Sequence, residues 1–386
     1  MRPTPRPRAP GALLRRAVGS AAVVRLAVGA AVLALVVGAV PTVAAESTVT
    51  VEATTDAALV PPMVSFRIGD GHGRARVASD DDPLADLPAL AVLDTGASTH
   101  LLSHDSAERF GVRTDSGARW VETGMGGEHA LAVSVPTTIT VEAGVPLTLA
   151  AQRLLVNDVP ASPDAMLANP GAIVDVIGMP AIEHAIVELR LGGGALGIPE
   201  VALLAPGATV RAEHWIALAF VDFNHRHHPR NRGTPPTATT NPVLRGVRVA
   251  HAGRDSSGDW LLDTGSAVTI VSTTTARALG LTQPAPLSAP VGGISGGEQA
   301  LPGWRVERIE LPMSDGGVIA VRDAAVFVHD VTTTGDDGSR TTLDGIVGIN
   351  LLAAFARAVI DVPHGRLGLD VAPATGDVRT PRSPHR

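Results

Sequence analysis

Residues 91–98 read AVLDTGAS, and residues 260–267 read WLLDTGSA. Each stretch contains an Asp-Thr-Gly triplet, which begins at Asp94 in the first and at Asp263, 169 residues later, in the second. The apolar run before each triplet is typical of a buried strand. The glycine tolerates backbone angles that other residues avoid, so the triplet predicts a tight turn. The sequence therefore predicts one strand-and-turn unit that the chain uses twice.

Two further pairs of segments extend this repeat along the chain. Residues 126–131 (GGEHAL) match residues 296–301 (GGEQAL), and residues 176–179 (VIGM) match residues 346–349 (IVGI), each at an offset of 170. Three pairs of landmarks in the same order and at almost the same spacing are not expected by chance. The pattern indicates a chain of two related halves.

Short helices are expected soon after each triplet, over residues 103–110 and 272–279. Each begins at a serine, a preferred N-cap, and each is followed by a glycine, which favours a helix end. The glycines of residues 124–127 and 292–297 are typical of hairpin tips. Strands dominate elsewhere, and the pattern indicates residues 138–141, 185–191, 215–223, 306–311 and 318–328.

The two triplets place one aspartate on each of two equivalent turns. If the halves meet face to face, the carboxylates lie about 3 Å apart, cannot both ionise cheaply and hold one proton between them. One then acts as a general base toward a bound water, while the other donates a hydrogen bond to the carbonyl under attack. This chemistry needs neither metal, thiol nor cofactor. The alternative is that Asp94 and Asp263 merely cap the helices that follow.

The composition excludes several classes of enzyme. The chain has 386 residues and contains no cysteine, no lysine and no tyrosine. The lack of cysteine excludes disulfide bonds, zinc ribbons, iron–sulfur centres and a thiol nucleophile. Schiff-base chemistry and a Walker phosphate loop both need lysine, so they are excluded as well. Hydrophobic residues make up 45% of the chain and charged residues 18%, which is enough apolar surface to bury a sizeable core.

The first 45 residues have the pattern of an export signal. Residues 1–25 carry six arginines and no acid, residues 26–45 form an uncharged apolar run, and residues 43–45 are small. This order is typical of a cleaved secretory signal peptide. The alternative is an uncleaved anchor, although the 15 residues from Leu26 to the proline at Pro41 are fewer than the roughly 20 that span a bilayer. Any membrane association is expected only through residues 26–45.

Loss of this segment changes the charge of the protein. The whole chain has a formal net charge of −7, whereas residues 46–386 carry 25 positive and 38 negative side chains, a net of −13. A chain this acidic repels phosphate backbones, so nucleic acid is not an expected partner. We expect an exported protein, located in the periplasm, in the cell envelope or outside the cell, with membrane anchoring as the alternative.

With these motifs the chain resembles the aspartic proteases of the pepsin/retropepsin superfamily over residues 59–372. The resemblance implies a mostly β protein of two similar β-barrel lobes related by pseudo-two-fold symmetry, with the active-site cleft between them. It implies that Asp94 and Asp263 bind the nucleophilic water. It also implies that Thr95 and Thr264 cross-brace the two turns by hydrogen bonds. The residues expected to support the site are Thr95, Gly96, Thr264, Gly265 and Ser266.

The segments expected to close over a bound peptide depart from the pepsin pattern. Pepsin-like enzymes carry a tyrosine on a single flap, whereas this chain has none and keeps a Gly-Gly segment in both halves. That arrangement is more similar to the two flaps of a retropepsin fused into one chain; plain hairpin turns are the alternative. The flap and substrate-binding candidates are Trp120, Met125, Gly126, Gly127, Gly296 and Gly297.

The chain is expected to have five parts. They are residues 1–45 (signal peptide or anchor), 59–205 (N-terminal lobe), 206–241 (interlobe connection and polar linker), 242–372 (C-terminal lobe) and 373–386 (disordered tail). Within the connection, residues 224–241 are polar, contain prolines and show no periodicity. This composition favours an exposed linker or loop.

Two clusters of potential metal ligands are better explained without a metal. His225, His227 and His228 have no further ligand at suitable spacing apart from Asp222, so a solvated linker is expected. Residues 80–82 are three aspartates that lack the spaced oxygen ligands of a calcium loop, and they are expected to form an exposed acidic turn. Neither a metal nor a cofactor is expected.

The expected function is that of an exported aspartic endopeptidase that hydrolyses peptide or protein substrates. Because both triplets lie on one chain, a monomer is expected to suffice. Two alternatives stay open: a catalytically inactive cell-envelope protein that uses the same fold to bind peptides, and a subunit that works only as a dimer of chains. A shared proton predicts a bell-shaped pH profile with its optimum on the acidic side of neutral.

Overall fold

The structure is a computed structural model that describes most of the chain after residue 46. The described residues are 47–55, 59–69, 88–124, 127–158, 175–191, 198–224, 226–292, 298–334 and 340–372. The chain divides into two units, Met1–Ala45 and Glu46–Arg386, and every described residue belongs to the second. The expected signal segment, acidic turn and C-terminal tail therefore lie outside the described residues. In the described part of the chain, no helix is both long and apolar enough to cross a membrane.

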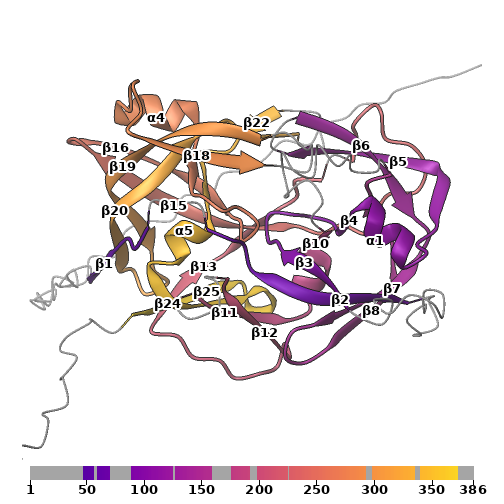
Figure 1. Ribbon diagram of the computed structural model, residues 1–386. Coiled ribbons are helices and arrows are strands. Elements are labelled where there is room, and N and C mark those ends of the chain that lie inside the picture. Colours follow the sequence, from indigo (N-terminus) through magenta and orange to yellow (C-terminus); the bar gives the residue numbers. More distant parts are fainter. Residues whose placement is uncertain are drawn as a thin grey trace, which may run out of the picture. The chain divides into compact units, whose positions relative to one another are not determined.

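The first half of the chain forms a nine-stranded sheet in the order β5-β6-β9-β4-β10-β3-β2-β7-β8 (Figure 1). Its strands are β2 (Met63–Gly69), β3 (Ala89–Leu93), β4 (Leu101–Leu102), β5 (Thr114–Gly124), β6 (Gly127–Ser134), β7 (Thr137–Glu142), β8 (Leu147–Gln152), β9 (Leu155–Val156) and β10 (Asp175–Ile177). Along β2, buried Val64, Phe66 and Ile68 alternate with more exposed residues, because successive side chains of a strand point to opposite faces. This buried face belongs to the main apolar cluster of the protein.

Most of the second half forms another nine-stranded sheet, in the order β1-β20-β17-β23-β16-β15-β19-β18, with β14 paired to β15 and β19 also paired to β20. Its strands are β1 (Thr48–Glu52), β14 (Ala219–Val221), β15 (Asn241–His251), β16 (Arg254–Leu262), β17 (Ile270–Val271), β18 (Leu287–Gly292), β19 (Glu298–Pro312), β20 (Val318–Val328) and β23 (Gly345–Val347). The N-terminal strand β1 lies parallel to β20 and so joins the sheet of the opposite half.

A third sheet takes strands from both halves, in the order β12-β11-β24-β25-β13. Its strands are β11 (Ile186–Arg190), β12 (Glu200–Leu204), β13 (His214–Ala217), β24 (Phe355–Asp361) and β25 (Arg366–Val371); β21 (Thr332–Thr334) and β22 (Arg340–Thr342) pair separately. Figure 1 shows β11 and β12 beside β24 and β25. The main apolar cluster contains Leu189 and Ile360 from this sheet as well as Phe66 and Trp260 from the other two. The two halves therefore share one sheet and one core.

Short helices complete the fold. Within the described residues they are α1 (His104–Arg109), α3 (Met179–Ile182), α4 (Thr273–Leu279) and α5 (Ile349–Leu352), and a 3-10 turn spans Val362–His364. The N-caps of α1 and α4 are the expected serines, because Ser103 Oγ accepts from the Ser106 N–H (3.2 Å) and Ser272 Oγ from the Thr275 N–H (3.1 Å). After α4, Gly280 adopts a left-handed conformation with φ of 73°. Both helix predictions are confirmed.

The strand predictions hold with one correction. The mostly β class is confirmed. β7 and β20 cover the expected segments, β11 is one residue shorter at each end than expected, and residues 306–311 lie in the later part of the longer β19. Residues 215–223, expected as one strand, form two strands, β13 and β14, in different sheets. They separate at Leu218, whose N–H donates to the Gly365 carbonyl (2.8 Å). The apolar pattern did not indicate this break because both strands are apolar.

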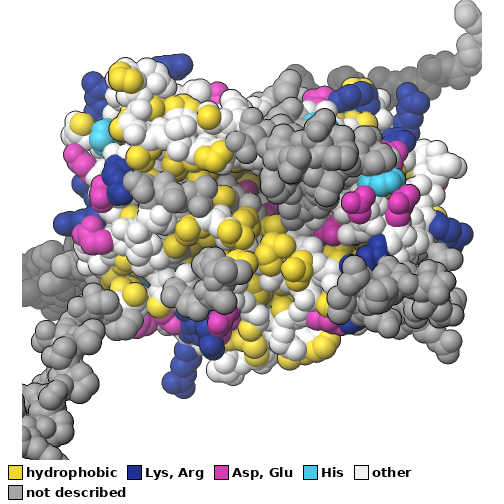
Figure 2. Space-filling model, viewed as in Figure 1, with side chains coloured by type: hydrophobic (Ala, Val, Ile, Leu, Met, Phe, Trp, Pro, Cys, Tyr) yellow, Lys and Arg dark blue, Asp and Glu magenta, His cyan; other side chains and the backbone are white. Residues whose placement is uncertain are grey.

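Charges of both signs are distributed over the described surface. Figure 2 shows arginines and acidic side chains mostly toward the edges of this view and hydrophobic side chains toward its middle. Ion pairs join neighbouring charges, as in Arg357 Nε with Asp370 Oδ2 and Arg305 Nη1 with Asp323 Oδ2, both 2.7 Å. Such partly exposed pairs each contribute little to stability. The fold therefore depends mainly on its core.

Substitution Ile360→Ala tests whether the shared sheet joins the halves energetically. Ile360 is fully buried in β24, so we expect a loss of about 2–5 kcal/mol in the free energy of unfolding. Because the third sheet belongs to both halves, the whole described unit is expected to unfold in one transition. Guanidinium denaturation followed by circular dichroism and by tryptophan fluorescence measures both properties. The control Leu90→Ala, at a side chain 59% exposed, should change little; separate transitions for the two signals would contradict the prediction.

Candidate active site

The two Asp-Thr-Gly turns follow equivalent strands. β10 lies parallel to β3, with Ile177 opposite Leu93, and β23 lies parallel to β16, with Val347 opposite Leu262. The Asp94 N–H donates to the Ile177 carbonyl and the Asp263 N–H donates to the Val347 carbonyl, both at 3.0 Å. Each aspartate therefore leaves its sheet at the same point, held by the apolar-apolar-Gly segment that the sequence repeat identified.

The two turns contact each other through a reciprocal set of hydrogen bonds between Thr95 and Thr264. The Thr95 N–H donates to Thr264 Oγ1 (3.1 Å), and the Thr264 N–H donates to Thr95 Oγ1 (3.0 Å). Each hydroxyl donates in turn to a carbonyl of the opposite half, Thr95 to Leu262 and Thr264 to Leu93, both at 2.6 Å. Both threonines are fully buried. We call these four bonds the threonine brace.

Asn241 supports the brace from the start of β15. Its Nδ2 donates to the Thr95 carbonyl (2.9 Å), and the side chain is fully buried. The sequence analysis did not identify this residue, because nothing in the sequence around Asn241 indicates that β15 begins beside the first turn. A polar residue directly before the apolar residues 242–244 was the only available signal.

Backbone amides orient both carboxyl groups. Asp94 Oδ1 accepts from the N–H groups of Gly96 (2.7 Å) and Ala97 (3.1 Å). Asp263 Oδ1 accepts from those of Gly265 (2.9 Å) and Ser266 (3.0 Å). Hydrogen bonds of this kind fix a short side chain in one rotamer. In each carboxyl the second oxygen stays available to the opposite half.

The two carboxyl groups lie against each other. They share a side-chain hydrogen bond. A Cβ atom at Gly96 would stand 2.5 Å from Asp263 Cγ, and a Cβ at Gly265 would overlap the Asp94 carboxyl group. Only glycine permits this approach, which explains the third letter of each triplet.

Burial and mutual repulsion raise the pKa values of the pair. Burial raises the pKa of Asp94, although hydrogen bonds from Asp263 and from backbone amides partly offset this. Burial and the negative charge of Asp94 together raise the pKa of Asp263 well above its usual range. The shift has the direction expected when two adjacent carboxyls keep one proton after the first has ionised. The site can therefore present a base and an acid side by side.

The other expected residues of this site take different positions. Ser266 contributes its N–H, but its hydroxyl donates to the Val268 carbonyl (2.7 Å). Gly124 pairs with Gly127 across the β5–β6 hairpin, whereas Met125 and Gly126 lie outside the described residues. Gly296 and Gly297 lie outside them as well. The described chain therefore does not show the tips of the two expected flaps.

Trp120 lies on β5 and is 5% exposed. It packs in an apolar cluster with Leu101, Leu131 and Leu155, and Ala97 lies against the same cluster. Ala97 is the residue whose N–H donates to Asp94. The structure therefore connects Trp120 to the first turn by packing.

Glu122, two residues farther along β5, was missed by the sequence analysis. Burial raises the pKa of its carboxyl group to about 8, so it is mostly protonated at neutral pH. Among the described residues, its buried Oε1 has no hydrogen-bond partner. A buried carboxyl group with a raised pKa is a candidate for contact with substrate. Its position just before the expected hairpin tip at residues 124–127 was the only signal in the sequence.

Residues 226–240, which we call the strap, lie against the first half of the chain instead of extending freely. Arg232 exchanges two backbone hydrogen bonds with Arg119 of β5, both at 2.9 Å. Farther along, the Thr239 N–H donates to the Ser98 carbonyl (3.0 Å). Many strap side chains are exposed, as expected of a linker, but its backbone is anchored both to β5 and to the turn after Asp94.

Charged side chains attach the strap to β6. Glu128 Oε2 lies 2.6 Å from Arg230 Nη2 and 3.4 Å from His228 Nε2. Within the described part of the chain no group of ligands could hold a metal ion, and His225 lies outside it. Of the described histidines in the expected cluster, His228 therefore forms an ion-pair contact with Glu128.

Comparisons with known proteins give similarity to solved structures alone. No protein-family model matches the chain, and no curated protein matches it. Among solved structures, the chain is similar to the crystal structure of aspartic proteinase from Irpex lacteus, with 14% sequence identity and a TM-score of 0.43. The alignment covers 81% of this chain and 96% of that chain.

Substitution Thr95→Val tests the threonine brace. Valine has the shape of threonine but lacks the hydroxyl, so the Thr264 N–H and the Leu262 carbonyl lose their partner in a buried site. We expect the free energy of unfolding to fall by about 2–5 kcal/mol. Thr95→Ser, which keeps the hydroxyl, is the control and should lose much less. Equal stability of the two variants in urea denaturation would show that the brace contributes nothing.

Substitution Glu122→Gln tests the burial of that carboxyl group. The pKa of Glu122 rises from 4.5 to about 8 on folding, so the folded state binds this proton more tightly and stability declines as pH rises through this window. Glutamine has no proton to lose. The advantage of the variant should therefore grow with pH, by at most about 1.4 kcal/mol per pH unit. Denaturation near pH 4 and near pH 7 measures the difference, and an advantage that does not change with pH refutes the prediction.

Proposed function

We propose that the protein is an aspartic endopeptidase in which Asp94 and Asp263 activate a water molecule for attack on a peptide bond. The observation that carries the proposal is the contact between two equivalent turns, each of which presents one carboxyl group to the other. In this proposal the two related halves are similar lobes, residues 59–205 and 242–372, and each supplies one aspartate to a cleft between them. No metal or cofactor takes part.

The proton held by the pair defines the chemistry. The ionised carboxylate takes a proton from the bound water as that water attacks the substrate carbonyl carbon. The protonated partner donates a hydrogen bond to the carbonyl oxygen, which becomes negatively charged in the transition state. When the tetrahedral intermediate collapses, a carboxyl group gives a proton to the leaving amine. The backbone amides that bind each Oδ1 keep both side chains in place throughout.

The rest of the proposal concerns partners and location. The substrate is a peptide or protein chain, and a monomer suffices because one chain supplies both aspartates. The pattern of residues 1–45 supports export, with the periplasm, the cell envelope or the exterior as the place of action. Activity is expected on the acidic side of neutral, where the pair holds one proton.

The variants Asp94→Asn and Asp263→Asn test the proposal. Each removes one ionisable oxygen without changing side-chain size, so hydrolysis of unfolded casein should fall on the order of 10³-fold or more. The matched control is Asp315→Asn. Asp315 accepts a similar turn hydrogen bond from the Gly317 N–H (3.0 Å), but it does not belong to the Asp94–Asp263 pair. The control should keep full activity.

Two outcomes would overturn the proposal. One is full activity in either variant of the pair. The other is a folded wild-type protein that binds peptide but hydrolyses none between acidic and neutral pH, which would indicate a binding protein instead. Circular dichroism of every variant establishes that folding is intact.

A further inference from the structure

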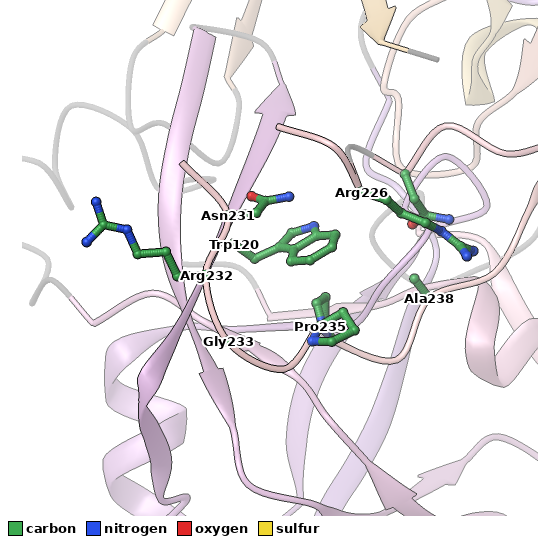
Figure 3. A pocket seen from close by; sticks show the side chains of 9 residues that line it. Trp120, Arg226, Asn231, Arg232, Gly233, Pro235 and Ala238 are labelled. Carbon is green, nitrogen blue, oxygen red and sulfur yellow. The ribbon is translucent and has the colours of Figure 1, made fainter. Parts of the chain in front are cut away.

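A pocket lies between β5 and the strap. Its volume is 440 Å³, and its walls include Trp120, Asn224, Arg226, Pro235, Pro236 and Ala238 (Figure 3). A water molecule occupies about 30 Å³ in the liquid, so the pocket has room for a large side chain. The figure shows the indole of Trp120 between Asn231 and Pro235, with Arg226 and Ala238 across from it.

Two polar atoms of the pocket residues are buried without a hydrogen-bond partner in the described chain. They are Trp120 Nε1, a donor, and Asn224 Oδ1, an acceptor. The orientation of Asn224 is fixed, because its Nδ2 contacts Asp222 Oδ1 (2.5 Å) and the Thr239 carbonyl (3.4 Å). Its Oδ1 must therefore face away from these acceptors. Buried polar atoms normally have partners, so a small movement of either side chain that exposes this donor and this acceptor to the pocket would let a ligand satisfy them.

The charges of the pocket favour a neutral ligand. Arg226 is paired with Asp222, with 3.1 Å between Nη2 and Oδ2. Figure 3 shows the side chain of Arg232 directed away from Trp120. A carboxylate ligand would have to compete with Asp222 for Arg226 and would place an anion near the Asn224 oxygen. A group that accepts one hydrogen bond and donates another matches the two unpartnered atoms without this conflict.

The pocket lies close to the proposed catalytic turn in space. Ala238 forms a β-bridge with Thr99, and the next strap residue binds the Ser98 carbonyl. On the other side, Trp120 packs in the cluster that Ala97 contacts. The wall of the pocket therefore continues directly into the turn that holds Asp94. A side chain bound here belongs to a residue near the peptide bond under attack.

We propose that this pocket is a subsite for a primary carboxamide, the side chain of glutamine or asparagine, of the bound peptide. The carboxamide oxygen accepts from Trp120 Nε1, and its amino group donates to Asn224 Oδ1. Pro235 and Pro236 contact the methylene groups. The assignment rests on the proposed function, since it concerns which residue of a substrate the enzyme prefers.

A binding experiment tests the subsite without any need for catalysis. The chain has four tryptophans, and the indole N–H signal of Trp120 in a nitrogen-15 spectrum is the one that disappears in Trp120→Phe. N-acetyl-glutamine methylamide should shift this signal in the full chain, whereas N-acetyl-leucine methylamide should not. No shift up to the solubility limit, or an equal shift with the leucine probe, overturns the proposal. A shift with N-acetyl-glutamate methylamide alone overturns it too, in favour of a carboxylate site.

A kinetic experiment tests the same subsite during hydrolysis. In a series of peptides that differ at one position, glutamine in place of leucine near the cleaved bond should raise kcat/KM. Trp120→Phe should reduce that preference by roughly fivefold to tenfold, the effect of one lost hydrogen bond. The matched control is Trp304→Phe, which changes a tryptophan of similar burial in β19 and should leave the preference unchanged.

The two proposals can fail separately. If no peptide is cleaved but the Trp120 signal responds to the glutamine probe, the proposed function fails and the subsite stands as a peptide-binding site. If peptides are cleaved without a glutamine or asparagine preference, the subsite assignment fails and the proposed function stands.

Discussion

The structure depends on the close approach of two backbone turns, which the threonine brace holds in place. Each threonine uses its N–H and its hydroxyl to bind the opposite half, and no water is needed at a contact where both side chains are fully buried. This contact decides where the carboxyl groups can be. With the backbone fixed and glycine at the third position, Asp94 and Asp263 have no room to separate, so repulsion between them is relieved only by retention of a proton. The raised pKa values therefore follow from the architecture.

Parts of the fold away from the two turns also keep the two halves in contact. The third sheet contains strands from both halves, and the main apolar cluster runs through all three sheets, so the halves cannot move apart without exposing core residues such as Ile360. On the opposite side of the first turn, Asn241 and the strap add polar contacts from the connection between the halves. The strap also closes one side of the Trp120 pocket. A segment that joins the halves thus forms part of the surroundings of the proposed active site.

The elements that could be predicted are those encoded by local pattern. The serine N-caps and the glycine after each helix predicted the helices. Alternating or continuous apolar runs predicted most strands. Both kinds of signal act within a few residues of the chain. The prediction of a single strand over residues 215–223 was wrong. The two strands found there join different sheets, but both are apolar, so composition does not separate them. Asn241, Asn224 and Glu122 could not be found in this way. Each is an ordinary polar residue whose position matters only because of partners, or the lack of them, far along the chain.

The repeat was enough to predict two related halves, each with an aspartate on a glycine turn. Three matched landmarks at offsets of 169 or 170 residues indicate equivalent local structures. Three features emerged only from the folded chain: the carboxyl groups share a hydrogen bond, the connecting segment lies along β5, and a pocket with an unpartnered donor and acceptor lies near the first turn. Hydrogen bonds, burial and repulsion depend on distances in space, and local sequence does not specify these distances.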